Sequence, residues 1–126
     1  MKPYRFAFLL AALATSLAAT AAMANPVIVS VSHTGALPGQ PTVNTQIQCV
    51  SNNIQLTAYY QRQQVSGSWG PTQFIARFWC KPPVNSGAVV IVPKSTTLPF
   101  TAQPGEHVRF RVQQGGQMSP WYPYQF

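Results

Sequence analysis

The sequence is nearly devoid of carboxylates: it has no aspartate and a single glutamate, Glu106, against eight lysines and arginines. Chemistry that needs paired carboxylates is therefore excluded. Any nucleophile–base–acid arrangement would depend on Glu106 as its only side-chain carboxylate. His107 follows Glu106 directly and would point to the opposite face of a strand, and His33 has no acidic neighbour in the sequence. We therefore predict that the protein is not an enzyme.

Motifs for metals and phosphate are scarce as well. The chain has only two cysteines, Cys49 and Cys80, and neither histidine has a local spacing to a cysteine that is typical of zinc sites. No glycine-rich loop precedes a helix, because no segment after residue 24 has a helical pattern. We predict no metal site, no cofactor and no dedicated nucleic-acid motif.

Long apolar runs are absent after the first 24 residues, and those residues have the layout of a secretory signal peptide. Lys2 and Arg5 are followed by an apolar run from Phe6 to Ala18, which is shorter than the ~20 residues of a membrane span. Ala22-Met23-Ala24 then predicts cleavage after Ala24. We expect residues 25–126 to form one exported domain, secreted or periplasmic, with no transmembrane segment after cleavage.

Positive charge dominates this expected domain. It carries six cations against one acid, a net side-chain charge of +5. The cations are Arg62, Arg77, Lys81, Lys94, Arg109 and Arg111. Most of them must face water or an outside anion, and such a field attracts anionic polymers and lipid headgroups without specifying which. A merely soluble basic surface is the alternative interpretation.

The two cysteines are expected to form one disulfide, because the chain is expected to be exported. The bond would close a loop of about 30 residues and stabilise the fold by roughly 3 kcal/mol in the chain-entropy account. Two free thiols are the alternative.

Alternation of apolar and polar residues predicts seven strands and no helix after residue 24. The expected strands are residues 27–32, 43–49, 54–61, 72–81, 88–92, 107–113 and 118–126. Prolines at 120 and 123 confine the last strand to an edge. Seven short strands in about 100 residues predict an all-β, two-sheet antiparallel sandwich. Cys49 and Cys80 both fall on the inward faces of their strands, as a bridge through the core requires.

The inward face of the fourth expected strand follows from the same alternation. Phe74, Ala76, Phe78 and Cys80 are predicted to point inward. The residues predicted to point outward are Ile75, Arg77, Trp79 and Lys81.

The stretch "LPFTAQPGEHVRFRVQQGGQMSPWYP" resembles the final third of a fibronectin type III domain. The resemblance rests on Pro104-Gly105, Phe110-Arg111-Val112, Gly115-Gly116 and Ser119-Pro120-Trp121. Val108 stands where those domains have a tyrosine, and the tryptophan expected on the second strand is absent. The resemblance covers about 25 residues and implies a fibronectin type III or immunoglobulin-like sandwich. Function does not follow from it, because this architecture has many unrelated roles.

The resemblance also implies that the third, fourth, sixth and seventh strands share one sheet, whose outer face would combine cations with aromatic rings. Receptor-type fibronectin III domains stack strand arginines on a Trp-Ser-x-Trp-Ser ending, and "MSPWY" is similar in keeping Ser119 and Trp121. A structural cation–π stack of Arg109, Arg111 and Trp121 is one hypothesis.

A ligand or partner on the same face is the second hypothesis. The residues predicted to contact it are Tyr59, Arg77, Trp79 and Lys81. The two hypotheses are compatible, because they use different residues.

We therefore predict a small binding or interaction module. Its basic, aromatic sheet face would contact an anionic or carbohydrate component of the cell envelope, or a protein partner. The main alternative is a small secreted inhibitor of an envelope or extracellular enzyme, with the loop Val65–Pro71 inserted into a cleft. A subunit that docks by strand exchange and an enzyme are the remaining alternatives.

Overall fold

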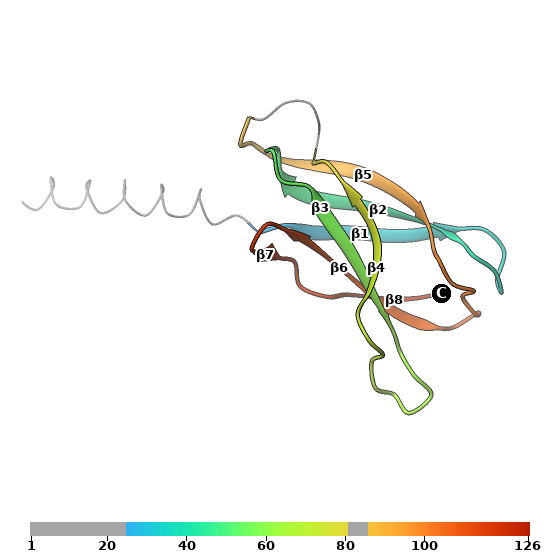
Figure 1. Cartoon of the computed structure of the whole chain (residues 1–126). Helices are drawn as coiled ribbons and strands as arrows, with labels where there is room; N and C mark the ends of the chain where they lie inside the picture. Colours follow the sequence, from blue (N-terminus) through green and yellow to red (C-terminus); the bar gives the residue numbers. More distant parts are fainter. Residues whose placement is uncertain (1–24, 81–85) are drawn as a thin grey trace, which may run out of the picture.

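The computed structural model describes residues 25–80 and 86–126, and within them the chain is entirely β-structure and loops (Figure 1). The strands are β1 Val27–Thr34, β2 Thr42–Val50, β3 Leu56–Arg62, β4 Gln73–Phe78, β5 Val89–Thr97, β6 His107–Gln114, β7 Gln117–Met118 and β8 Tyr122–Gln125. The predicted signal peptide and Lys81 lie outside the described residues.

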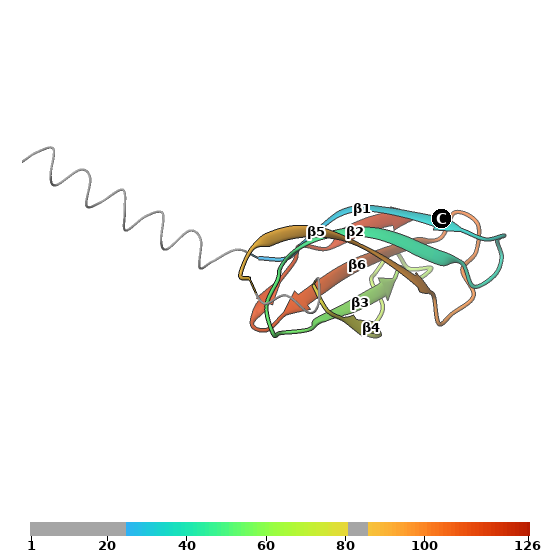
Figure 2. The same ribbon diagram turned by 90° about the horizontal axis from the view of Figure 1, so that it is seen from above.

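Two antiparallel sheets pack face to face, which confirms the predicted sandwich. One sheet has three strands in the order β1-β2-β5. The other has five strands, in the order β4-β3-β6-β7, with β8 also paired to β6. Seen from above, β1, β2 and β5 form one layer and β3, β4 and β6 the other (Figure 2). Placing the third, fourth, sixth and last strands in one sheet agrees with the grouping that the resemblance implied.

Inward side chains from both layers build one core. Ile47 of β2, Leu56 of β3, Leu98 after β5, and Val108 and Val112 of β6 are almost completely buried. The period-two alternation places them there, since every second residue of a strand faces the other sheet.

The Cys49–Cys80 disulfide joins the two sheets, as predicted. Cys49 lies near the end of β2, Cys80 lies two residues beyond β4, and both are buried. In antibody domains the bridge instead joins the second strand to the strand that corresponds to β6. Membership of the fibronectin type III or immunoglobulin-like families stays a prediction.

The predicted inward face of the fourth strand is wrong over its first half. β4 contains a bulge: Ala76 pairs with Ala58, but the next pair joins Phe74 to Tyr59, so Ile75 is an extra residue. A bulge reverses the side-chain alternation beyond it. Ile75 therefore packs against the core, and Phe74 is about half exposed. Phe78 and Cys80 point inward, as predicted.

Two other strands differ from the prediction. The expected strand 118–126 is divided into β7 and β8, because Ser119–Trp121 leaves the ladder at Pro120. The expected strand 88–92 continues to Thr97 and lies at the edge of the three-stranded sheet. Its even-numbered residues Val90 and Val92 pack inward, and Val89 and Ile91 are exposed.

Candidate binding face of the five-stranded sheet

The register of the five-stranded sheet arranges its outward residues in rows. Arg77, Thr57 and Gln113 form one row across β4, β3 and β6. Phe74, Tyr59 and Arg111 form the next row, and Gln61 and Arg109 the one after. Cations from two strands therefore share this face with aromatic rings. We call this outer surface the basic face; its cations are Arg77, Arg109 and Arg111.

Arg109 and Arg111 are brought together by Trp121. The guanidinium carbon of Arg109 lies 4.6 Å from the centre of the Trp121 ring, and that of Arg111 lies 4.4 Å from it. These are the three residues of the hypothesised stack. The distances fall within the ~6 Å at which a cation is attracted to the face of an aromatic ring.

The stack has a fourth member, Trp69, which sequence reasoning missed. Its ring lies 4.4 Å from the Arg109 guanidinium, so Arg109 sits between two tryptophans. Trp69 belongs to the loop between β3 and β4, where its backbone forms an isolated antiparallel β-bridge with that of Gln63. Continuing the alternation of β3 outward through Gln61 and Gln63, and closing a hairpin there, would have placed Trp69 on this face.

Within the described residues, each arginine of the stack donates a hydrogen bond through its Nε atom alone. The Nε of Arg109 donates to Oε1 of Gln61 at 2.8 Å, and the Nε of Arg111 donates to the carbonyl oxygen of Ser119 at 3.3 Å. Their Nη groups have no hydrogen-bond acceptor among the described residues. Both side chains are half-buried, so the Nη groups can still donate to an outside acceptor.

Ser119 positions the segment that carries Trp121. Its hydroxyl accepts from the backbone N–H of Val112 at 2.9 Å, and its own N–H donates to the carbonyl of Val112 at 2.8 Å. These two hydrogen bonds hold the segment between β7 and β8 against β6, where neither strand pairs with it. Ser119 thus holds in place the segment whose Trp121 ring contacts both arginines.

Three of the four predicted contact residues lie in the described part of the chain. Tyr59 is half-buried beside Arg111, and its hydroxyl donates to Gln113 at 3.2 Å. Arg77 is exposed, with its guanidinium 5.8 Å from the Phe74 ring. Trp79 is 42% exposed beyond the end of β4. Lys81 lies outside the described residues.

The only side-chain carboxylate is already engaged, by Arg62. Glu106 accepts from Nε of Arg62 at 2.6 Å and from its Nη2 at 3.0 Å, and from the backbone N–H of Gln103 at 3.0 Å. The Arg62 guanidinium also lies 4.1 Å from the Phe100 ring. Among the described cations, Arg62 alone has a carboxylate partner.

This pairing shifts both pKa values. The hydrogen bond to Glu106 raises the pKa of Arg62, against the opposing effect of partial burial. Partial burial by itself would raise the pKa of Glu106. The hydrogen bonds from Arg62 and Gln103 and the charge of Arg62 outweigh it, and the pKa of Glu106 is lowered. Glu106 is therefore ionised at neutral pH and tied to one cation.

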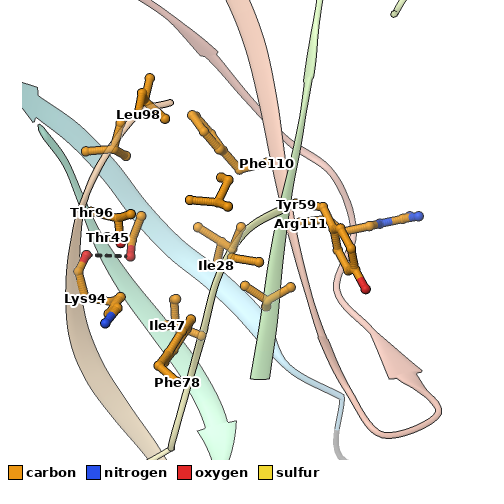
Figure 3. Close-up of a pocket in the computed structure, with 14 residues that line it drawn as sticks. Ile28, Thr45, Ile47, Tyr59, Phe78, Lys94, Thr96, Leu98, Phe110 and Arg111 are labelled. Carbon is orange, nitrogen blue, oxygen red and sulfur yellow. Dashed lines mark hydrogen bonds between the residues drawn. The ribbon is translucent and has the colours of Figure 1, made fainter. Parts of the chain in front are cut away.

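Lys94 differs from the cations of the basic face. It lies on β5 and extends toward the other sheet, with its Nζ 5.3 Å from the Phe78 ring. Figure 3 shows it at the margin of a small apolar cavity between the sheets, while Tyr59 and Arg111 point away from the interior. The cavity volume is about 30 Å³, which is enough for water but too small for a ligand.

A second hollow lies beneath the loop between β3 and β4. It measures about 540 Å³ and is lined by Tyr60, Pro71, the Arg62–Glu106 pair and several glutamines. Its two charged groups neutralise each other, so it offers no net charge to an anion.

The histidines take separate places. His33, at the end of β1, shares a hydrogen bond with the hydroxyl of Tyr124, and its ring lies 5.0 Å from that of Phe126. Burial is the main cause that raises the pKa of Tyr124. His107 is exposed at the start of β6. The described residues contain no cluster of three or more histidine, cysteine or acidic side chains that could hold a metal.

Comparisons of this chain with known proteins identify no related protein. No protein-family model matches the chain, and no curated protein or solved structure matches it. Within residues 25–80 and 86–126 there is no helix long and apolar enough to cross a membrane.

Proposed function

We propose that this protein is an exported binding module that holds an anionic polymer of the cell envelope against its basic face. The proposal rests on how Arg109 and Arg111 are held on the basic face. Each is fixed by a ring contact and one Nε hydrogen bond, and the Nη donors of each have no acceptor among the described residues. Fixed guanidinium groups suit sulfate, phosphate and carboxylate groups, which accept paired N–H donors.

Preorganisation strengthens this proposal. A flexible arginine loses rotamer freedom when it binds, whereas an arginine already held between rings loses less. Arg77, exposed on the neighbouring row, adds a third cation that the described residues leave without a carboxylate. The predicted signal peptide would deliver the domain to the compartment where envelope polymers are found.

A salt titration with a defined polyanion tests the proposal. We expect the protein to bind dextran sulfate at about 20 mM NaCl, to lose most of that affinity by about 300 mM, and to ignore uncharged dextran. The double variant Arg109→Gln/Arg111→Gln should bind at least about tenfold more weakly, as measured by isothermal titration calorimetry.

Two further variants control this experiment. Arg77→Gln lies outside the stack and should weaken binding without changing the fold. Lys94→Gln removes the same charge from the interior side of the other sheet and should have a much smaller effect. Absence of binding at low salt, or equal loss in all the charge variants, would contradict the proposed function.

A secreted inhibitor is the second candidate, and the loop between β3 and β4 favours it. In Figure 1 this loop extends beyond the rest of the sandwich. Backbone and side-chain hydrogen bonds among Gln63, Gln64, Gly67 and Ser68 stiffen it, and Val65 at its tip is fully exposed. A rigid loop with an apolar tip is suited to insertion into a cleft. An inhibitor of this kind would lose its target with Val65→Asp and keep it with Arg109→Gln/Arg111→Gln.

A further inference from the structure

The outer face of the three-stranded sheet is uncharged along its whole described length. The register arranges it in four rows across β1, β2 and β5 and a fifth row across β2 and β5. Its residues are Val27, Ser30, Ser32, Thr34, Thr42, Asn44, Gln46, Gln48, Val50, Val89, Ile91, Pro93, Ser95 and Thr97. None of them ionises, so the charge of this basic protein lies elsewhere. We call this surface the neutral face.

One end of the neutral face is apolar and exposed. Ile91 is 56% exposed, Val89 51%, Val29 48% and Val27 37%. Val27 and Ile91 lie in the same row, on either side of Gln48, and Val89 is the next outward residue along β5. Val29 occupies the bulge of β1 beside them. Grouped exposure of aliphatic side chains is typical of an interaction surface, unlike isolated exposed residues.

Charge decides which occupant fits this surface. A polyanion has no cation to contact there, so it does not select the neutral face. Two copies of this chain repel each other through their basic faces, because Arg77, Arg109 and Arg111 lack carboxylates to neutralise them. The neutral face is where two such molecules can approach with little like-charge repulsion.

The sheet edges favour packing through a face over pairing through an edge. β1 is interrupted by its bulge, and β5 carries Pro93, which has no N–H to donate. In the other sheet β4 is bulged, and β8 contains Pro123. Continuous strand pairing between copies is therefore hindered at each of these four edges.

We infer that a second copy of this chain packs on the neutral face, with the cluster Val27, Val29, Val89 and Ile91 buried inside a face-to-face sheet contact. Two sheets that pack in this way lie about 10 Å apart with their apolar side chains interdigitated. The pair turns both basic faces outward. If the proposed function holds, such a dimer is bivalent and gains avidity for a repeating polyanion.

Sedimentation velocity on the exported protein tests this inference. The protein is purified after export, and mass spectrometry establishes its N-terminus. We expect a monomer–dimer equilibrium over about 5–200 µM. The dimer fraction should rise between about 50 and 500 mM NaCl, because salt screens repulsion between basic molecules while apolar contact persists. Binding to dextran sulfate should change with salt in the opposite direction.

Matched variants locate the contact. Ile91→Lys places a charge within the cluster and should weaken dimerisation at least about tenfold. Val89→Lys provides a second variant at a similarly exposed site. Val65→Lys makes the same kind of change at a fully exposed valine on the β3–β4 loop, and should leave the equilibrium unchanged. Far-UV circular dichroism and the melting temperature establish that each variant is folded.

The outcomes separate this inference from the proposed function. The inferred dimer would be refuted if the wild-type protein stayed monomeric at about 200 µM at both NaCl concentrations. It would also be refuted if Ile91→Lys dimerised as tightly as the wild type. Either result leaves the effect of Arg109→Gln/Arg111→Gln on dextran sulfate binding untouched. Conversely, a dimer that ignores dextran sulfate would refute only the proposed function.

Discussion

At the scale of single residues, the shortage of acids makes Glu106 the only side chain that can pair with a cation by charge. It takes part in three hydrogen bonds, two from Arg62 and one from the turn at Gln103. Its side chain is 12% exposed, whereas that of Arg62 is 42% exposed. Solvent therefore screens the pair in part, and its contribution to the free energy of unfolding is modest.

Glu106→Gln should lower the free energy of unfolding by about 1 kcal/mol at pH 7. Because the pKa of Glu106 is lowered by folding, the stabilisation is fully present above the ordinary pKa of 4.5. It is lost as the pH falls below that value and through the lowered folded-state pKa. Urea unfolding between pH 3 and 7 measures this dependence.

The variant should be nearly as stable at pH 3 as at pH 5, since it lacks the only titrating side-chain carboxyl. A variant whose stability falls with acid as steeply as that of the wild type would show that the ion pair is not the cause.

At the scale of elements, Trp121 joins three parts of the five-stranded sheet. It immediately precedes β8, and it lies against two arginines of β6, one of which also contacts Trp69 of the β3–β4 loop. Together with the buried Ser119 it connects the C-terminal segment to the middle of the sheet.

Trp121→Ala should therefore destabilise the fold by about 2 kcal/mol, from two ring–cation contacts and the lost apolar burial. Trp79→Ala is the matched control. Trp79 is 42% exposed and has no cation over its ring among the described residues, so its loss should cost clearly less than that of Trp121. Chemical denaturation followed by circular dichroism compares the two, and equal losses would argue against a structural role for the stack.

The edges also matter at this scale. Bulges in β1 and β4, and prolines in β5 and β8, interrupt the four edge strands. Such interruptions protect edges against pairing with other chains. The hypothesis of a strand-exchanging subunit is therefore not favoured by this arrangement.

At the scale of the whole molecule, the disulfide is the only covalent connection between the layers apart from the chain itself. It joins Cys49 of β2 to Cys80, which lies 31 residues further along the chain and follows β4 of the other sheet. Removing it with Cys49→Ser/Cys80→Ser should lower the free energy of unfolding by about 3 kcal/mol.

Urea unfolding of the oxidised protein, of the reduced protein and of the double variant measures this effect. The reduced protein and the double variant should agree. A loss below about 1 kcal/mol would indicate that core packing alone holds the sheets together.

The local pattern predicted most of the fold. Alternation of apolar residues is a property of neighbouring positions, so it located the strands and placed Cys49 and Cys80 inward before any partner strand was known. It failed at Ile75, because a bulge depends on the partner β3, which the pattern of β4 alone does not reveal. It also missed Trp69, whose position depends on how the β3–β4 hairpin closes.

The sequence by itself determined which groups the protein has and how they alternate along each strand. The expected domain has six cations and one acid, its two cysteines both fall on the inward faces of their strands, and its expected first and second strands carry no charge. Only the tertiary structure decided how these features are distributed. In the folded protein Glu106 forms an ion pair with Arg62, and Arg109 lies between two tryptophan rings. The strands β1, β2 and β5 form one sheet, whose outer face is uncharged. The reason is physical: side-chain parity is local to a strand, whereas strand order and pairing join residues that are far apart in the chain.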